Sequence, residues 1–274
     1  MRSYLYVPGD SPAKLAKALT VGADAIIIDL EDAVPPPGKA AARAAVAAFL
    51  RISSGPQLWV RVNPGPLGHE DARAVAGPWL AGICVAKTLS AAELVELDGV
   101  LSDAERLVGG VAAVVPLLES ASAILAAPSI ALAPRVARLQ IGEADLAADL
   151  GVTLGPDERE LLWARSHVVL ASAAAGIEPP VGPVSTNFRD FDALRESTVA
   201  LKRLGYRGRA CIHPAQLVVV HEVFTPTAAE LAAATEVVAR HAEALASGSG
   251  VCVGADGRLI DEAVVRSARR LLGG

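Results

Sequence analysis

Short apolar, β-branched runs alternate with Ala- and Leu-rich helical stretches along most of the chain. This alternation is typical of repeated βαβ units around a parallel sheet. Two of the runs, 24–30 and 111–118, lack a polar position at every second residue, which is expected of strands covered on both faces. The pattern predicts strands at 3–7, 24–30, 57–62, 81–86, 111–118, 136–142, 178–184 and 209–213.

Eight is the number of strands that closes a barrel, and 274 residues suit one α/β barrel of about 250. The predicted fold class is therefore α/β, a (β/α)8 TIM barrel. An open doubly wound sheet would show the same alternation, but no Gly-x-Gly-x-x-Gly follows the first strand. The main helical stretches between the strands are 38–51, 90–105, 120–132, 157–175 and 190–204.

The C-terminal part of the chain departs from this repeat. A helical pattern at 227–247 meets a Ser/Gly patch at 247–250, and a short apolar piece, an Asp256-Gly257 turn and a final helix from about Leu259 follow. We expect a barrel at 1–225 and a helical extension at 226–274. A hinge at the patch would let the extension act as a lid or pack on a neighbouring subunit.

Composition and charge exclude several classes of protein. A net charge of −5 leaves no basic field for nucleic acid. No apolar run reaches the roughly 20 residues of a membrane span, and the N-terminus is too quickly polar for a secretory signal, so we expect a cytoplasmic protein. Cys84, Cys211 and Cys252 are few and widely spaced, which favours free thiols over disulfides or a zinc site.

Charged residues gather where the predicted strands end. In a parallel barrel these ends meet at one face, which carries the active site. The residues concerned are Asp29, Glu31 and Asp32 after the second strand, Arg61 at the end of the third, Lys87 after the fourth, Glu119 after the fifth, Asp145 after the sixth and His213 at the end of the eighth.

Glu119 and Asp145 follow neighbouring strands, so their carboxylates can approach one centre. Oxygen ligands without Cys or His at ligand spacing favour Mg²⁺, with Mn²⁺ as an alternative, over zinc. The competing interpretation is that each acid caps the helix after it. The further carboxylates Asp29, Glu31 and Asp32 at the same mouth favour the metal, because they would repel one another without a cation.

Three basic or neutral side chains complete the candidate site. Arg61 can hold a carboxylate or an enolate oxygen, or it can form a salt bridge to the acidic cluster. Lys87 is either a Schiff-base lysine or a residue that balances charge. His213 is either a hydrogen-bonding group at the ligand mouth or a residue satisfied within its own turn.

At these positions the sequence resembles the citrate lyase β-subunit-like family of CoA-ester lyases, within the HpcH/HpaI aldolase/citrate lyase superfamily. The resemblance covers essentially the whole chain. The motifs, in order, are Tyr6-Val7-Pro8-Gly9, Asp29-Leu30-Glu31-Asp32-Ala33, Lys39 with Ala42-Arg43, Arg61-Val62-Asn63, Leu118-Glu119-Ser120, Gly142-Glu143-Ala144-Asp145-Leu146, Cys211-Ile212-His213-Pro214-Ala215-Gln216 and Leu259-Ile260-Asp261.

The resemblance implies a magnesium-dependent barrel that breaks or forms a carbon–carbon bond between an acyl-CoA enolate and a keto or aldehyde group. It further implies a homotrimer. In it Glu119 and Asp145 would bind the metal, Arg61 would bind substrate and steady the enolate, and Glu31 and Asp32 would orient metal-bound waters. The stretch around His213 would lie near the CoA. Asp261 would reach a neighbouring subunit's site as the catalytic base that takes the hydroxyl proton, with capping of the last helix as its alternative role.

The expected activity is that of a stand-alone lyase on a short 3-hydroxyacyl-CoA such as citryl-, malyl-, citramalyl- or 3-hydroxy-3-methylglutaryl-CoA. Two alternatives stay open. One is a citrate lyase β subunit that is active only with an acyl-carrier partner, and the other is a metal-dependent aldolase on free 2-keto acids. Ala86, Thr88 and the order Glu143-Ala144-Asp145 depart from the family's usual pattern around the acyl pocket.

Overall fold

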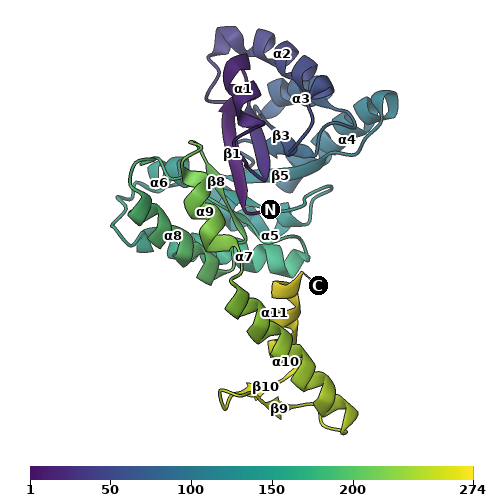
Figure 1. Ribbon diagram of the computed structural model, residues 1–274. Coiled ribbons are helices and arrows are strands. Elements are labelled where there is room, and N and C mark those ends of the chain that lie inside the picture. Colours follow the sequence, from purple (N-terminus) through teal and green to yellow (C-terminus); the bar gives the residue numbers. More distant parts are fainter. Residues whose placement is uncertain (274) are drawn as a thin grey trace. The chain divides into compact units, whose positions relative to one another are not determined.

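The computed structural model describes residues 1–273, and its eight parallel strands close into a barrel in sequence order (Figure 1). Closure occurs because β1 pairs with both β2 and β8. The predicted barrel is thus confirmed. The strands are β1 Ser3–Pro8, β2 Ala25–Asp29, β3 Gln57–Val62, β4 Gly82–Val85, β5 Ala113–Leu118, β6 Gln140–Ile141, β7 Val181–Gly182 and β8 Gly208–Cys211.

Two predicted strands are much shorter than expected, and the ranges 136–142 and 178–184 were wrong in extent. β6 and β7 contribute two residues each to the ladder. Val136 forms only an isolated bridge with Val114. Proline at 179, 180 and 183 removes backbone N–H donors on both sides of β7. The barrel therefore closes through brief pairing at these two strands.

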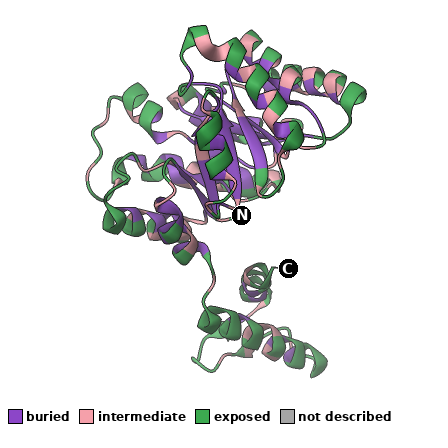
Figure 2. Ribbon diagram, turned by 45° about the horizontal axis from the view of Figure 1, so that its top comes forward, coloured by how far each residue is buried: buried purple, intermediate pink, exposed green. Residues whose placement is uncertain are grey.

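The helices surround the strands, which Figure 2 shows as a buried centre with exposed outer helix faces. Side-chain caps begin several of them, as where Ser90, Ser120 and Asp190 accept hydrogen bonds from backbone N–H groups three residues on. The bounds are α1 Pro12–Ala18, η1 Pro36–Gly38, α2 Lys39–Ile52, α3 Gly65–Val75, α4 Ala91–Val108, α5 Ala121–Ala131, α6 Glu143–Leu150, η2 Arg159–Leu161, α7 Leu162–Ala175, α8 Phe191–Leu204 and α9 Gln216–Phe224.

Strand alternation divides the apolar side chains into two cores. The larger lies between the barrel and its helices and includes Ile26, Ile28 and Val60. A smaller core inside the barrel includes Ile27, Trp59 and other side chains from the opposite face of the same strands. The inward-facing series therefore runs along each strand toward its carboxyl end, where the candidate site residues lie.

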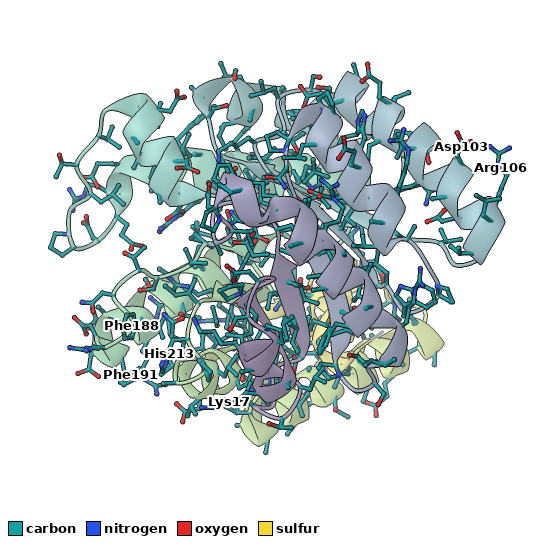
Figure 3. All side chains as sticks on the ribbon, turned by 90° about the horizontal axis from the view of Figure 1, so that it is seen from above. Lys17, Asp103, Arg106, Phe188, Phe191 and His213 are labelled. Atoms are coloured by element: carbon teal, nitrogen blue, oxygen red, sulfur yellow. The ribbon has the colours of Figure 1, made fainter. Side chains whose placement is uncertain are left out.

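The loops after β7 and β8 contact each other through an aromatic pair. The rings of Phe188 and His213 stack with centroids 5.2 Å apart and 19° between their planes (Figure 3). Nδ1 of His213 also accepts a hydrogen bond from the backbone N–H of Ala215 at 3.1 Å. His213 is thus engaged within its own turn and by the neighbouring loop.

The chain divides into two compact units, Met1–Phe224 and the residues from Thr225 onward. The second unit contains α10 Ala228–Ala246, β9 Cys252–Val253, β10 Leu259–Ile260 and α11 Glu262–Leu272. The final helix begins three residues later than the predicted Leu259. Leu259 and Ile260 instead pair antiparallel with Val253 and Cys252, and Asp261 caps α11 by accepting from the N–H of Val264 at 3.0 Å.

Within residues 1–273, one stretch, 216–246, has the length and hydropathy of a membrane-spanning helix. It consists of two separate helices, α9 and α10, which lie on either side of Pro226. α9 has 9 residues, too few to cross a bilayer of about 30 Å. α10 carries charged side chains at 230, 236, 240 and 243. Cys84, Cys211 and Cys252 are free thiols, as predicted.

Candidate active site

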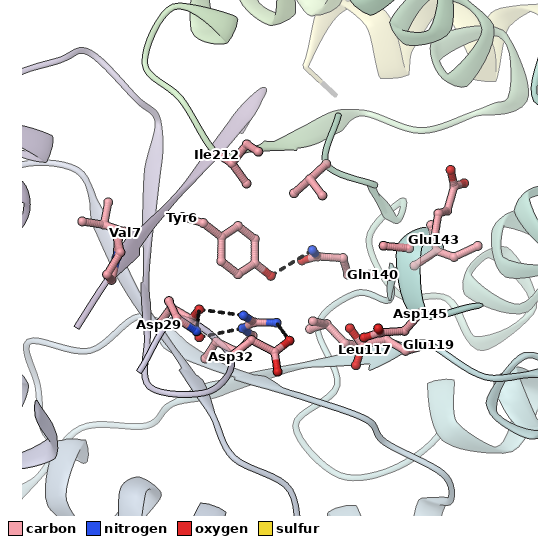
Figure 4. Close-up of a pocket in the computed structure, with 17 residues that line it drawn as sticks. Tyr6, Val7, Asp29, Asp32, Leu117, Glu119, Gln140, Glu143, Asp145 and Ile212 are labelled. Carbon is pink, nitrogen blue, oxygen red and sulfur yellow. Dashed lines mark hydrogen bonds and ion pairs between the residues drawn. The ribbon is translucent and has the colours of Figure 1, made fainter. Parts of the chain in front are cut away.

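A cavity of about 330 Å³ opens at the carboxyl ends of the strands (Figure 4). It lies where catalytic side chains of this fold gather, because its walls are formed by the strands near their carboxyl ends and by the residues that follow them. Five of the predicted site residues line it: Asp29, Asp32, Arg61, Glu119 and Asp145. The structure thus brings together residues from four different strand ends, as the sequence predicted.

Arg61 is held in a fixed orientation by the acidic residues after β2. Its Nε and Nη2 donate to the two oxygens of Asp29 at 2.7 and 2.6 Å, and its Nη1 lies 2.9 Å from Glu31 Oε2. The salt bridge weighed as an alternative role is therefore present. Burial lowers the pKa of Arg61, but the hydrogen bonds and charge of Asp29 outweigh it and raise the pKa overall, so the guanidinium stays charged.

Asp29 also folds the loop that carries its neighbours. Its carboxylate accepts from the backbone N–H groups of Glu31 and Ala33 at 2.9 and 3.1 Å. From the other side, Lys39 Nζ donates to the carbonyls of Leu30 and Glu31. The loop after β2 is therefore fixed by a carboxylate at one end and an ammonium at the other.

Lys87 balances charge beside Glu31 and Asp32. Its Nζ is hydrogen-bonded to Glu31 and lies 3.3 Å from Asp32 Oδ1. Burial lowers the pKa of Lys87, but the hydrogen bond and charge of Glu31, with the charge of Asp32, raise it well above its usual value. A Schiff-base lysine needs a neutral amine. The structure therefore favours the charge-balancing interpretation.

Glu119 is a buried acid of the cavity, with 7% of its surface exposed. Its Oε2 accepts from the backbone N–H of Lys87 at 2.8 Å. That N–H is aimed by an unusual backbone angle, since Lys87 has a φ of 52°. Burial raises the pKa of Glu119 to about 7, and the charges of Asp145 and Glu31 add to this rise. The hydrogen bond from the Lys87 N–H and the charge of Arg61 oppose it.

Gly142 makes room for this carboxylate. A Cβ at position 142 would lie 2.4 Å from Glu119 Cγ and 2.5 Å from Oε1, so only glycine fits here without displacing Glu119. Gly142 is also the N-cap residue of α6. The first turn of α6 contains Glu143, which Arg165 holds with two hydrogen bonds of 2.5 Å, and the exposed Asp145.

Neither acid of the predicted metal pair caps a helix. Ser120, the residue after Glu119, caps α5, and the N-cap of α6 provides no side-chain hydrogen bond. The capping interpretation is therefore wrong for both acids. Figure 4 shows Glu119 and Asp145 close together at one side of the cavity.

These two carboxylates fit a magnesium ion. Among residues 1–273, no three or more His, Cys, Asp or Glu side chains are grouped to hold a metal, so the rest of the coordination would fall to water and ligand oxygens. Magnesium is commonly bound in this way, through one or two carboxylates. A cation there would also stabilise the ionised form of Glu119, whose pKa is raised by burial and by Asp145.

Of the four candidates that do not line the cavity, Glu31 and Lys87 adjoin it through ion pairs with Arg61 and Asp32. The other two lie elsewhere. His213 is exposed and is not among the cavity-lining side chains, whereas its neighbour Ile212 lines the cavity. Asp261 belongs to the second unit, where its carboxylate caps α11. The role of each in binding or catalysis stays a prediction.

Sequence reasoning missed two polar residues of the cavity, Tyr6 and Gln140. Gln140 Nε2 donates to the Tyr6 hydroxyl at 2.9 Å, and the Arg61 guanidinium lies 5.3 Å from the Tyr6 ring centroid. The signal was available in the predicted strands 3–7 and 136–142. Alternation places Tyr6 on the same face as Tyr4, and Gln140 on the same face as Arg138, so these side chains point into the barrel.

The fold and the cavity together define a (β/α)8-barrel enzyme whose active site lies at the carboxyl ends of the strands. The model of the HpcH/HpaI aldolase/citrate lyase family matches residues 2–214. The chain belongs to this family, which confirms the predicted resemblance.

Similarity extends over more than nine tenths of three relatives. The citrate lyase subunit beta of Leuconostoc mesenteroides subsp. cremoris is 33% identical, with 99% of this chain and 92% of the relative covered. The (3S)-malyl-CoA thioesterase of Cereibacter sphaeroides is 34% identical, with 99% and 93% covered. CitE of Mycobacterium tuberculosis, solved with magnesium, acetoacetate and coenzyme A, is 28% identical, has a TM-score of 0.78 and covers 99% of this chain and 97% of its own.

Proposed function

We propose that this protein is a magnesium-dependent lyase that cleaves, or in reverse forms, the carbon–carbon bond of a short 3-hydroxyacyl-CoA. The observation that carries the proposal is the convergence of Glu119, Asp145 and Arg61 on one cavity. Relatives named for citrate lyase and malyl-CoA chemistry, and one solved with magnesium and coenzyme A, support the class of substrate. Citryl-, malyl-, citramalyl- and 3-hydroxy-3-methylglutaryl-CoA are the candidate substrates.

In the cleavage direction, a base removes the proton of the 3-hydroxyl group. The oxygen's electrons then form a carbonyl, the bond between C2 and C3 breaks, and its electron pair passes into the thioester enolate. Magnesium, held by Glu119 and Asp145, would act as a Lewis acid toward the substrate's oxygens. Protonation of the enolate carbon gives the second product, an acyl-CoA.

Arg61 is suited to stabilise the developing enolate. A guanidinium has five N–H groups. Asp29 and Glu31 engage three of them through Nε, Nη2 and Nη1, which leaves N–H groups for a ligand oxygen. Because Asp29 fixes the plane of the guanidinium before substrate arrives, little reorganisation is needed as negative charge develops. Glu31 and Asp32 keep this cation and Lys87 paired, and we propose that they also orient waters beside the metal.

Asp261 is our candidate for the base, and His213 our candidate for contacts near the CoA. Both assignments rest on the family resemblance of their motifs. We further propose that the second unit packs on a neighbouring subunit of a homotrimer and closes over its site, with the Ser/Gly patch at 247–250 as the hinge. Three free thiols accord with a cytoplasmic enzyme.

The test is release of acetyl-CoA from a panel of the four candidate esters by the purified chain, with Mg²⁺ and with EDTA. Magnesium-dependent release from one ester, lost in Glu119→Gln and Asp145→Asn, is the expected result. Release that is equally fast in EDTA would contradict the proposal. A Glu178→Gln variant, altered at an exposed acid outside the cavity, serves as the control.

A second candidate is a β subunit that acts only on an ester carried by a partner protein. The name of the Leuconostoc relative, a subunit of citrate lyase, favours it. This form of the function would be established if the chain cleaves none of the CoA esters but shows magnesium-dependent cleavage once an acyl-carrier protein bearing the acyl group is added. Turnover of a free hydroxy-keto acid without CoA would instead indicate an aldolase.

A further inference from the structure

The proposed metal ligand Asp145 lies in the first turn of the short helix α6. The strand before this helix, β6, has two residues in the barrel ladder, and the N-cap Gly142 provides no side-chain hydrogen bond. Of the eight side chains of α6, two are buried, those of Glu143 and Leu146. The orientation of the first turn therefore depends on how these two side chains are held.

Arg165 of α7 holds Glu143 at two points. Its Nε and Nη2 each donate to one carboxylate oxygen of Glu143 at 2.5 Å, and its Nη2 also donates to Glu158 at 2.7 Å. Arg165 is 3% exposed and Glu143 is 8% exposed. Because two parallel hydrogen bonds join the groups, the guanidinium fixes the plane of the carboxylate as well as its distance. An ammonium group, which is a point charge, would fix the distance alone.

The backbone around Arg165 is itself held in place. α7 is a helix of 14 residues that packs against α5. The carbonyl of Arg165 accepts a hydrogen bond at 3.2 Å from the hydroxyl of Tyr206, which is fully buried. Burial lowers the pKa of Arg165, but the hydrogen bonds and charges of Glu143 and Glu158 raise it overall. Glu143 is thus tied to a cation that keeps its charge at neutral pH.

α6 is also tied to the segment that carries Glu119, the other proposed ligand. Asp149, one turn after Asp145, accepts from the backbone N–H of Ala121 at 2.7 Å. Ala121 is the first residue of α5 and follows Glu119 by two positions. Figure 4 shows Glu119 and Asp145 close together at the cavity. A shift in the first turn of α6 therefore changes the separation of two carboxylates that would share one ion.

We propose that Arg165, acting through Glu143, is a positioning residue that places the Asp145 carboxylate for magnesium. The proposal rests on the function proposed above, and it concerns how the metal site is built. Both oxygens of Glu143 accept from Arg165, so Glu143 holds the turn while the side chain of Asp145 stays exposed for the ion. Residues that orient metal ligands contribute about 10- to 100-fold to metal affinity or activity.

The test variant is the double substitution Glu143→Leu/Arg165→Met. Removing both charges avoids the unpaired buried charge that either single substitution would leave. Calorimetry without substrate measures Mg²⁺ affinity, and circular dichroism with thermal unfolding in EDTA measures folding. The folded double variant is expected to bind Mg²⁺ about 10- to 100-fold more weakly than wild type. Arg165→Lys keeps the charge but not the two-bond geometry, so its Mg²⁺ affinity is expected to lie between those of wild type and the double variant.

The buried ion pair of Glu105 and Arg135 provides a matched control. Arg135 Nη1 donates to the two oxygens of Glu105 at 2.9 and 2.7 Å, and Glu105 also accepts from the N–H of Ala112, just before β5. Neither member of this pair lines the active-site cavity. Glu105→Leu/Arg135→Met is therefore expected to alter thermal unfolding while Mg²⁺ affinity stays at the wild-type value.

Wild-type Mg²⁺ affinity in the folded Glu143→Leu/Arg165→Met protein would overturn the inference and leave the proposed function intact. An equal loss of affinity in the control pair would also overturn it, because loss of any buried ion pair would then weaken metal binding. A wild-type protein that binds no Mg²⁺ would overturn the proposed function, and the inference with it. If the double variant does not fold, Arg165→Lys decides: reduced Mg²⁺ affinity supports the inference, and unchanged affinity overturns it.

Discussion

Substituting Gly142 with alanine tests whether the position of Glu119 controls metal binding. The added Cβ would lie 2.4 Å from Glu119 Cγ. Carbon atoms pack at about 3.5–4.0 Å, so the Glu119 side chain has to move by about 1 Å. It has little freedom to do so, because its Oε2 is hydrogen-bonded to the Lys87 N–H and the residue is 7% exposed. Gly142 has a φ of −103°, so alanine brings no backbone strain of its own.

A displacement of about 1 Å at a reacting centre costs about 100-fold in rate. We therefore expect Gly142→Ala to lose about 100-fold in kcat/KM and about tenfold or more in Mg²⁺ affinity. Calorimetric titration with Mg²⁺ and the thioester-release assay measure the two quantities. Circular dichroism and thermal unfolding in EDTA establish that the barrel remains folded.

Gly99→Ala is the control substitution. Gly99 lies inside α4, and no atom lies within 4 Å of an added Cβ. Alanine there is expected to leave metal binding and turnover unchanged and to stabilise the helix by about 0.5–1 kcal/mol. Wild-type Mg²⁺ affinity in Gly142→Ala would refute the argument that the space beside Gly142 sets the position of the Glu119 carboxylate.

Three more predictions concern charged groups. Burial raises the pKa of Glu119 to about 7, so its contribution to the free energy of unfolding is full below its unfolded-state pKa and is lost as the pH rises to about 7. In EDTA, Glu119→Gln should therefore be more stable than wild type by up to about 3 kcal/mol at pH 8 but by little at pH 4, as measured by urea unfolding. An equal difference at both pH values would contradict this prediction. Since Lys87 stays protonated, borohydride with a keto acid should add no mass to the protein, and an adduct on Lys87 would restore the Schiff-base interpretation. Asp261→Asn keeps an N-cap acceptor, whereas Asp261→Ala removes it and should cost about 1 kcal/mol of stability in the second unit. Both variants should lose turnover if Asp261 is the base. An active Asp261→Asn enzyme would exclude that role.

The strand pattern predicted the barrel because each strand is marked by its own local sequence. Ile26, Ile27 and Ile28, for example, are apolar on successive positions, and the strand they form is covered on both faces. The same reasoning overestimated β6 and β7. Pairing there depends on which backbone N–H groups reach a neighbour, and apolar composition does not reveal this.

The candidate site was predictable as far as strand ends determine it. Arg61, Glu119 and Asp145 share the cavity because parallel strands end at one face. The ion pairs among Arg61, Asp29 and Glu31 depend on side-chain geometry that spacing does not specify. Tyr6 and Gln140 escaped notice because they are neutral and lie 134 positions apart, so that only the closed barrel brings them into contact.

The uneven burial of the three cysteines gives the protein a natural labelling site. Burial raises the pKa of Cys84 and of Cys211 to about 12, and both thiols are inaccessible within the barrel unit. Cys252 is partly accessible and belongs to the second unit. A maleimide dye added to the native protein should therefore attach at one place. Without any engineered cysteine, the emission of that dye can follow the C-terminal segment as substrate binds and product leaves.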